Sequence, residues 1–480
     1  MAASRLLAPY FGTSQLVWAN LIGLILIGLS LGYAYGGRLA DRRPEPRLLY
    51  GLVLAAGVYQ ALIPLLARPV LSAMLGGWFG TPVTVIAASF AAILLIFLPP
   101  VVILAMVSPF TIRLATKDVA ESGRVAGGLY AASTLGSIAG TFVPAFLTIP
   151  FLGTKETIFL FAALQIAVAA WRLGRPLHAL WLLVPAAAAA LTPGVVKPVA
   201  GLLFEDDTLY QYVQVVEEGG ERLLVINEGG GIQSVYDPHH LLTGLYTDSF
   251  AVLPFLARPA GPRPERALVI GSAGGTLFRI WDRLVRPRLP MEMWGVEIDP
   301  VVASLGPRYF GLRGDEARVV VADGRVALAR FREPFDLVVV DAYANQLYIP
   351  FQLSTREFFA EVRRRLAPQG LLALNVNATG DDAPLLLAFE RTVADVFPYT
   401  YVAKVRGPLN YMVLGAARPL DLRPLEELRG SGDLAPLAAE LQAALRPADG
   451  SGGILLTDDR APVEYLTNAM VLSAVRRSIR

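Results

Sequence analysis

Long apolar runs fill the first 196 residues of the chain, and shorter apolar runs separated by polar segments fill the rest. A transmembrane helix needs about 20 consecutive, mostly apolar residues. The runs that approach this length are Gln15–Gly36, Leu48–Ala67, Val83–Ser108, Gly127–Pro150, Glu156–Trp171 and His178–Val196. The pattern predicts an α-helical transmembrane bundle over residues 1–196, with a kink at Pro99 and Pro100 in the third span.

Basic residues mark one side of this predicted bundle. Arginine and lysine gather after the first, third and fifth spans, and cytoplasmic loops are the loops enriched in these residues. If all six spans cross, the rest of the chain emerges on the far side of the membrane. If His178–Val196 does not cross, the rest stays in the cytoplasm. The sequence therefore predicts a multi-pass protein of the cell (inner) membrane and leaves the side of its soluble part open.

Residues 197–260 have the pattern of a small β-rich subdomain. Leu209–Val216 alternates apolar and polar residues with the period of a half-buried strand, and Leu223–Ile226 follows after a glycine turn. A second turn leads to a strand at Ile232–Tyr236. A helix is expected from His239 to Leu253.

Strands and helices alternate in residues 261–480. Such alternation predicts a doubly wound, mostly parallel, Rossmann-type sheet with helices on both faces. The expected strands are Ala267–Ile270, Met291–Val296, Arg318–Ala322, Phe335–Val340 and Leu371–Asn375.

Small and acidic residues stand at the carboxyl ends of these strands, where doubly wound sheets bind their ligands. The first strand ends in the glycine turn Gly271–Gly275, and Glu297, Asp323 and Asp341 end the next three. Glycines let a backbone approach a ligand, and a carboxylate about 20 residues on can accept both hydroxyls of a ribose. Asp323 is placed to accept from an adenine amine. The pattern favours a nucleoside site; the alternative is that the carboxylates cap the following helices.

Composition narrows the class of protein. The chain is 54% hydrophobic and 17% charged, with a mean hydropathy of +0.50, which excludes a disordered chain, a coiled coil and an ordinary cytosolic enzyme. The net charge of +2 gives no support for nucleic-acid binding. The absence of cysteine excludes disulfides and thiolate chemistry, and with three histidines we expect no metal site.

Ordered motifs in the soluble part resemble spermidine synthases, which are polyamine aminopropyltransferases with a methyltransferase-like fold. The motifs are Tyr210-Gln211, Gln233-Ser234, Tyr246-Thr-Asp248, Gly271…Gly274-Gly-Thr276, Val296-Glu-Ile-Asp-Pro300, Ala322-Asp-Gly-Arg325, Val340-Asp-Ala342 and Leu353–Phe359. The tail Leu456–Glu464 and the N-terminal motifs Ser4–Gly12 and Gly36–Arg42 resemble the membrane-fused subfamily. In that subfamily a further helix usually precedes Ser4.

The resemblance implies a reaction at the sulfonium of decarboxylated S-adenosylmethionine, in which an amine takes the aminopropyl group and methylthioadenosine leaves. It assigns Asp341 as the catalytic base that removes the amine's proton. The implied cofactor-binding residues are Gln211, Gly271, Gly274, Gly275, Glu297, Asp323 and Gly324, and the implied substrate-binding residues are Tyr246, Asp248 and Tyr343.

Two positions depart from the family pattern. Ala273 stands where the family has the acid that holds the aminopropyl ammonium, and Ala344 stands where it has the acid that holds the acceptor amine. Each lost carboxylate removes a charge-assisted hydrogen bond worth roughly 1.5–3 kcal/mol. The nucleoside half of the implied site is therefore intact, and the polyamine half is altered.

Three functions stay open. The first is a membrane-anchored aminopropyltransferase with an altered small-molecule amine acceptor. The second is an S-adenosylmethionine-dependent methyltransferase or other alkyltransferase acting on a lipid or apolar substrate. The third is a catalytically impaired nucleoside- or polyamine-binding membrane protein. The expected partners are the lipid bilayer, the amine and a second copy in a homodimer, with no nucleic acid.

Overall fold

The structure is a computed structural model, and it describes residues 2–12, 14–76, 82–192, 194, 196–227, 231–257, 264–344 and 347–478. The expected turn at residues 228–230 and the expected boundary at residue 260 lie outside the described residues. The chain forms two compact units, Met1–Pro198 and Val199–Arg480, which are described separately.

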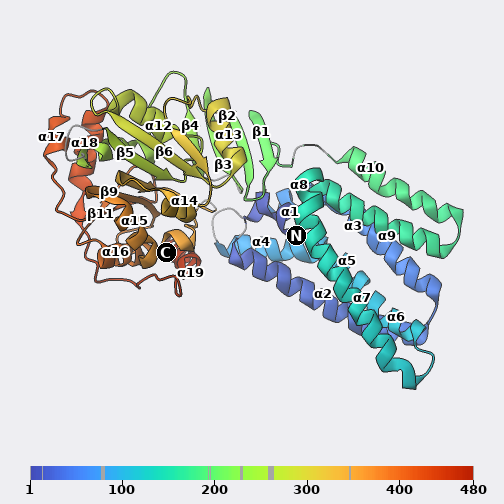
Figure 1. The fold of residues 1–480 in the computed structure, drawn as a ribbon. Coiled ribbons are helices and arrows are strands. Elements are labelled where there is room, and N and C mark those ends of the chain that lie inside the picture. Colours follow the sequence, from blue (N-terminus) through green and yellow to red (C-terminus); the bar gives the residue numbers. More distant parts are fainter. Residues whose placement is uncertain are drawn as a thin grey trace. The chain divides into compact units, whose positions relative to one another are not determined.

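The secondary structure of the N-terminal unit is helical in its described residues (Figure 1). Within this part of the chain, five helical segments are long and apolar enough to cross a membrane: Gln15–Arg42, Pro46–Met74, Leu98–Ala115, Ser122–Leu152 and Thr154–Leu173. The helices of this unit are α1 (Ala2–Phe11), α2 (Gln15–Arg42), α3 (Pro46–Gly76), α4 (Pro82–Ile96), α5 (Leu98–Ala105), α6 (Val107–Ala115), η1 (Val119–Glu121), α7 (Ser122–Val143), η2 (Pro144–Thr148), α8 (Ile149–Leu152), α9 (Thr154–Leu173), η3 (Pro176–Leu182) and α10 (Leu183–Leu191).

Two of the six expected spans differ from the prediction. The third run is divided at Phe97, because Pro99 and Pro100 have no N–H groups to continue the α4 ladder. The sixth helical segment, Pro176–Leu191, is too short to count among the long apolar helices. It ends there because the following Thr192 precedes a proline, which disfavours helical backbone at that residue.

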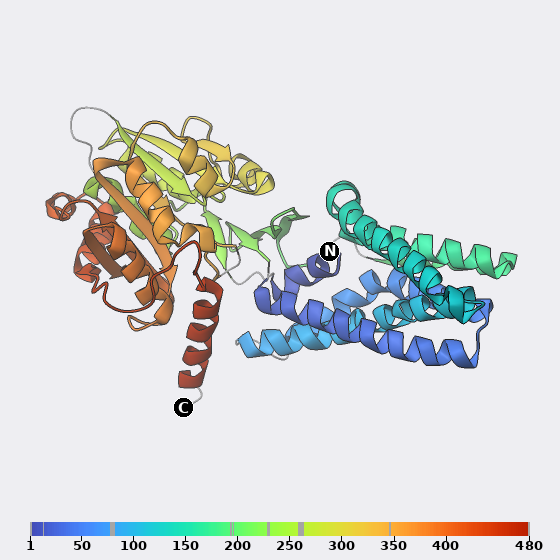
Figure 2. The same ribbon diagram turned by 60° about the horizontal axis from the view of Figure 1, so that its bottom comes forward.

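Helix α2 packs closely against α5 and α6. Gly28, Gly32 and Gly36 are its buried glycines, and a Cβ on Gly36 would meet the Met106 side chain at 2.8 Å. Figure 2 shows α2 running alongside its neighbours in the N-terminal unit. Close backbone contact through small residues is typical of helices that associate in lipid.

A four-stranded antiparallel sheet begins the C-terminal unit, in the order β1-β2-β3-β4. Its strands are β1 (Leu202–Asp207), β2 (Tyr212–Glu218), β3 (Glu221–Ile226) and β4 (Ile232–Tyr236). Strand β1 was not expected, and β2 begins three residues later than the alternation suggested.

The expected helix from His239 to Leu253 is wrong. The segment instead contains the 3-10 helix η4 (Tyr246–Val252) and then the short helix α11 (Leu253–Leu256). Asp248 accepts hydrogen bonds from the backbone N–H groups of Thr243 and Gly244, which fixes a turn where an α-helix was predicted. Pro254 does not stop α11, because it occupies the first turn, where its missing N–H has no intrahelical partner.

An eight-stranded sheet in the order β12-β10-β11-β9-β8-β5-β6-β7 forms the centre of the C-terminal unit. Strands β5 to β9 pair in parallel, as predicted, and β10, β11 and β12 add an antiparallel edge that was not. The strands are β5 (Glu265–Ile270), β6 (Met291–Glu297), β7 (Arg318–Val321), β8 (Phe335–Val340), β9 (Leu366–Asn377), β10 (Tyr399–Lys404), β11 (Asn410–Ala416) and β12 (Arg446–Pro447).

Helices cover both faces of this sheet, which confirms the doubly wound architecture (Figure 1). The apolar strand residues alternate between two buried clusters, one under α14, α15, α16 and α19 and the other under η4, α12, α17 and α18. The helices are α12 (Thr276–Ile280), η5 (Trp281–Val285), α13 (Pro300–Tyr309), α14 (Gly324–Arg330), η6 (Phe351–Leu353), α15 (Arg356–Arg365), α16 (Pro384–Val396), α17 (Arg423–Glu427), α18 (Leu434–Ala444) and α19 (Val463–Ser478).

Candidate active site

The turn after β5 brings the backbone close to the end of β8. Gly271 has φ +87°, and a Cβ there would collide with the backbone of Asp341. Gly275 has φ +84° and begins α12. Both positions require glycine, because this left-handed backbone and this close approach exclude a side chain. Ala273 adopts φ +46° in the same turn, a region that costs a non-glycine residue about 1–2 kcal/mol.

The small sheet is bonded to this glycine turn. Ser234 of β4 accepts a hydrogen bond from the N–H of Gly274 at 2.8 Å, and Thr276 bonds both backbone groups of Val235. Residues of β2 and β3 also pack against α13 in one apolar cluster. The small sheet is therefore a fixed wall beside the turn.

Glu297 ends β6 and is buried, with 7% of its surface exposed. Its Oε2 accepts from the N–H of Ala273 at 3.0 Å, and its Oε1 accepts from the N–H of Asp299 at 3.1 Å. Burial raises the pKa of Glu297, and these backbone hydrogen bonds oppose the rise. The structure thus places this carboxylate against the glycine turn, and its role as a ribose contact stays a prediction.

Gln211 lies near the same strand end. Its carbonyl accepts from the N–H of Thr208 at 3.0 Å, and the Thr208 hydroxyl donates to the carboxylate of Asp299 at 2.6 Å. Asp299 in turn caps α13 by accepting from the N–H of Val301. These contacts place the backbone of Gln211 beside the turn that follows Glu297.

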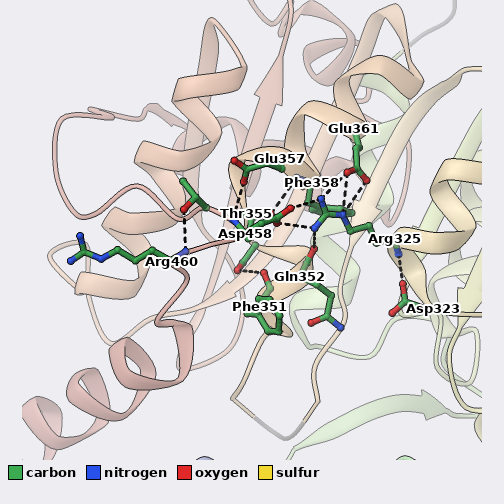
Figure 3. A network of polar contacts seen from close by, with 12 residues as sticks. Asp323, Arg325, Phe351, Gln352, Thr355, Glu357, Phe358, Glu361, Asp458 and Arg460 are labelled. Carbon is green, nitrogen blue, oxygen red and sulfur yellow. Dashed lines mark hydrogen bonds and ion pairs between the residues drawn. The ribbon is translucent and has the colours of Figure 1, made fainter.

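Asp323 ends β7 and caps α14, whose first residue is Gly324. Its Oδ1 accepts from the N–H groups of Arg325 and Val326, both at 3.0 Å, and the first of these bonds is drawn in Figure 3. Capping is therefore one role of this carboxylate. Both of these bonds end on Oδ1, so we expect Oδ2 to be the oxygen that would face an adenine amine.

Asp341 ends β8 and receives hydrogen bonds from neutral side chains. The Tyr246 hydroxyl lies 3.1 Å from its Oδ2, and Asn375 donates from Nδ2 to its Oδ1 at 3.0 Å. Burial raises the pKa of Asp341 to about 6, and the two hydrogen bonds oppose that rise. A carboxylate with this pKa is ionised at neutral pH and basic enough to accept a proton.

Two tyrosines flank this carboxylate. Tyr246 comes from η4, and Tyr343 follows β8 and donates to the carbonyl of Asn375 at 2.9 Å. Burial, followed by the negative charge of Asp341, raises the pKa of both phenols well above their usual value. Both therefore stay neutral and remain hydrogen-bond donors.

Asp248 is fully buried and faces its own turn. Its carboxylate accepts from Thr243 and Gly244 and lies 3.4 Å from Nη1 of Arg406. These contacts make Asp248 a support for the turn that carries Tyr246. A direct substrate contact by Asp248 stays a prediction.

Asn375, Asn377 and Asn410 were missed by sequence reasoning. Asn410 donates from Nδ2 to Oδ1 of Asn375 at 3.2 Å and to Oδ1 of Asn377 at 3.1 Å. The available signal was a polar residue at the carboxyl end of an apolar strand, since Asn375 closes the predicted fifth strand. Asn410 gave no such signal, because its strand was not predicted.

The C-terminal tail contacts the first turn of α14, next to Asp323. Figure 3 shows the guanidinium of Arg325 held between Glu361 of α15 and Asp458 of the tail, with nitrogen–oxygen distances of 2.7 and 2.8 Å. Asp458 also accepts from the hydroxyl of Thr355 at 2.6 Å. Asp458 therefore serves this network, which fastens the tail next to the cap formed by Asp323.

Comparison with known proteins identifies relatives of this chain. No family model matches the chain. A probable polyamine aminopropyl transferase of Bifidobacterium longum is 33% identical over 285 residues, which cover 55% of this chain and 62% of that protein. A polyamine aminopropyltransferase of Vibrio vulnificus is 32% identical over 194 residues, covering 37% of this chain and 60% of that protein. The chain thus spans about 60% of the length of these relatives.

One solved structure with a similar fold is a probable spermidine synthase from Corynebacterium glutamicum, with 20% identity, a TM-score of 0.42, and coverage of 55% of this chain and 97% of that one. The sequence relatives confirm the resemblance that the motifs indicated. Their names do not extend to the membrane-fused subfamily, which stays a prediction.

Proposed function

We propose that this relative of the polyamine aminopropyltransferases transfers the aminopropyl group of decarboxylated S-adenosylmethionine to an amine acceptor. The observation that supports the proposal best is Asp341, a carboxylate at a strand end with a pKa raised to about 6 and two neutral hydrogen-bond donors. It lies beside the glycine turn, which also contacts Glu297.

The nucleoside half of the donor would lie across the carboxyl ends of β5, β6 and β7. Glu297 would accept the ribose hydroxyls and Asp323 the adenine amine, with Gly271, Gly274 and Gly275 allowing the sulfonium group to come close to the backbone. Gly324 and Gln211 would complete the donor contacts. A carboxylate that already accepts backbone hydrogen bonds is held rigidly, which lowers the cost of binding.

The transfer step requires a proton acceptor. An amine is protonated at neutral pH, so its nitrogen has no lone pair until a base removes a proton. Asp341 takes that proton. The nitrogen then forms a bond to the aminopropyl carbon that is attached to sulfur. As this carbon–sulfur bond breaks, its electron pair stays with sulfur, and neutral methylthioadenosine leaves.

The acceptor half of the site supports a change of acceptor. Tyr246 and Tyr343 supply aromatic surface and hydroxyls, and Ala344 supplies no charge where the family has an acid. We propose that the acceptor carries less positive charge away from its reacting nitrogen than an ordinary polyamine does. Burying a second ammonium without a counter-charge is costly.

Ala273 favours a second candidate, a methyltransferase or alkyltransferase that uses S-adenosylmethionine itself. The carboxylate of that donor would be repelled by an acid at this position and is tolerated by alanine. A lipid or apolar acceptor would suit such an enzyme.

We further propose that the N-terminal unit anchors the protein in the cell membrane. Its five long apolar helices and the close packing along the α2 glycines support this reading. The lipid bilayer would then be a partner of residues 1–196.

The donor test uses the full-length protein in detergent. Calorimetric titration with decarboxylated and carboxylated S-adenosylmethionine, followed by detection of methylthioadenosine or S-adenosylhomocysteine in the presence of amines, separates the candidates. We expect tighter binding of the decarboxylated donor and release of methylthioadenosine. Preference for the carboxylated donor with release of S-adenosylhomocysteine would support the second candidate. Binding without turnover would leave a nucleoside-binding protein.

A further inference from the structure

The hairpin formed by β10 and β11 contacts Asn375, one of the two donors to Asp341, and the turn that carries the other donor, Tyr246. Asn410, at the start of β11, is paired with Asn377 of β9. Asn375 lies two residues earlier on β9, and residues at this spacing share a face of the sheet. The three asparagines therefore stand together on the face that also carries η4.

The asparagines form a hydrogen-bond chain with one direction. Asn410 donates to Oδ1 of Asn375, and Asn375 donates from Nδ2 to Oδ1 of Asp341. A side-chain amide has one acceptor oxygen and one donor nitrogen. Because the oxygen of Asn375 is engaged by Asn410, its nitrogen faces the carboxylate. A reversed Asn375 amide would place its oxygen against the Asp341 carboxylate and its nitrogen against the donor nitrogen of Asn410.

A second contact runs from the same hairpin to Asp248, in the turn that carries Tyr246. Arg406 lies in the loop between the two strands, and its Nη1 is 3.4 Å from Oδ2 of Asp248. Its other nitrogens bind Glu440 of α18 at 2.7 and 2.8 Å. Asp248 is fully buried, and a buried carboxylate needs a counter-charge or hydrogen bonds. Arg406 thus helps hold the turn that carries Tyr246.

We infer that the β10–β11 hairpin positions the proton-accepting carboxylate, with Asn410 orienting Asn375 and Arg406 securing the turn of Tyr246. The inference rests on the proposed function of Asp341 as base. Asn410 and Arg406 are positioning residues that act through their neighbours. Asn375 thus holds Oδ1 of Asp341 and the Tyr246 hydroxyl holds Oδ2. The amine's proton would go to a remaining lone pair of this oriented carboxylate.

The first test changes Asn410. In Asn410→Asp the side chain keeps its shape and loses its donor, and in Asn410→Ala it loses the donor without gaining charge. Gln442→Ala, which removes an amide bonded to Glu426 on α17, is the matched control. The titratable groups that interact with Asp341 are Tyr246 from η4 and Tyr343 from the loop after β8.

Two measurements follow the carboxylate in these variants. One is the pH dependence of methylthioadenosine release from decarboxylated S-adenosylmethionine, with the amine that the unaltered protein uses best. The other is an infrared titration of the Asp341 carboxyl, identified by its difference from Asp341→Asn, which needs no turnover. Thermal melting of each variant checks that it folds.

We expect the infrared midpoint to rise by about one pH unit in Asn410→Asp, which lowers turnover below the midpoint about tenfold. Asn410→Ala should shift it in the same direction by less, and Gln442→Ala not at all. No shift in either Asn410 variant would overturn the inference. So would a shift in Asn410→Asp alone, because added charge would then explain it. If the midpoints shift and the unaltered protein shows no turnover, the proposed function fails and the positioning of Asp341 stands.

The second test compares the two acidic partners of Arg406, Asp248 and Glu440. Arg406→Gln removes the counter-charge of Asp248, and Glu440→Gln removes only the outer partner. We expect Arg406→Gln to lower kcat at least tenfold with unchanged donor affinity, and Glu440→Gln to change kcat by much less. Equal effects in the two variants would assign Arg406 a purely structural role.

Discussion

The position of Asp341 could be predicted from the sequence, but its hydrogen-bond donors could not. Its place at the end of an apolar strand was readable from sequence, because the strand pattern and the acid are local. Its donors were not readable, since Asn375 and Tyr246 are separated from it by 34 and 95 positions and meet it only in the folded sheet. The sequence therefore predicts a carboxylate at this edge, and the fold supplies its raised pKa.

The pH dependence of turnover follows from that pKa. Asp341 accepts a proton only when ionised, and burial raises its pKa to about 6. We expect kcat to rise with pH through a midpoint near 6 and to flatten above it. Steady-state rates of methylthioadenosine release between pH 5 and pH 8 check this. A rate that is flat across this range would exclude Asp341 as the titrating base.

Ala273 allows a test of donor choice at the residue scale. In Ala273→Asp a carboxylate is placed in the glycine turn, where it would pair with the donor's ammonium and repel the carboxylate of S-adenosylmethionine. We expect the ratio of the two affinities to move about tenfold or more towards the decarboxylated donor. Calorimetry on both donors measures it, with Ala273→Asn as the uncharged control. Equal changes for both donors would show that the turn does not contact that end of the ligand.

At the scale of elements, local sequence patterns predicted some strands and helices, and others depend on contacts between residues far apart in the chain. The parallel strands β5 to β8 were predictable because each is an apolar run followed by turn residues. The antiparallel strands β10 and β11 were missed. The 3-10 helix η4 was also missed, because it depends on the turn around Asp248. The contact between Arg325 and Asp458 joins residues 133 positions apart.

The tail network of Figure 3 predicts a measurable contribution to stability. Asp458→Asn removes the charge that pairs with Arg325, and the side chain of Asp458 is 44% exposed, so solvent screening limits the loss to about 1 kcal/mol. We expect the melting temperature to fall by about 2–4 °C at pH 7.

Asp459→Asn, at the exposed neighbouring position, is the control for the tail. The pKa of Asp458 is lowered by Arg325, so the carboxylate stabilises the fold above its unfolded pKa and loses that effect as pH falls. The difference between Asp458→Asn and the unaltered protein should therefore shrink in acid. A difference that persists at low pH would mean that the ion pair is not its source.

At the scale of the whole molecule, hydropathy divides the chain near residue 197, and contacts divide it at Pro198. Sequence reasoning left the membrane side of the C-terminal unit open, because six crossings and five crossings give opposite answers. Among its described residues the structure has five long apolar helices and a shorter segment at Pro176–Leu191. We therefore propose five crossings, which would put the C-terminal unit on the same side as the arginine-rich loops, the cytoplasmic side by the positive-inside rule.

Protease or reporter accessibility at the Glu218–Gly220 turn tests this topology. We expect a reporter inserted at this exposed turn to be protected in intact cells and accessible from the cytoplasmic side of inverted vesicles. A reporter at Glu45, in the loop after α2, should behave identically. Opposite behaviour of the two sites would show that Pro176–Leu191 crosses the membrane.

The measurement that tests the proposed function most directly is the mass of the acceptor. It is taken after incubation of the full-length protein with decarboxylated S-adenosylmethionine and a panel of amines. The account predicts an acceptor that has gained one aminopropyl group in equal amount to the methylthioadenosine released, with both products absent for Asp341→Asn although the donor still binds. An acceptor that gains a methyl group from S-adenosylmethionine, or equal product from Asp341→Asn, would contradict it.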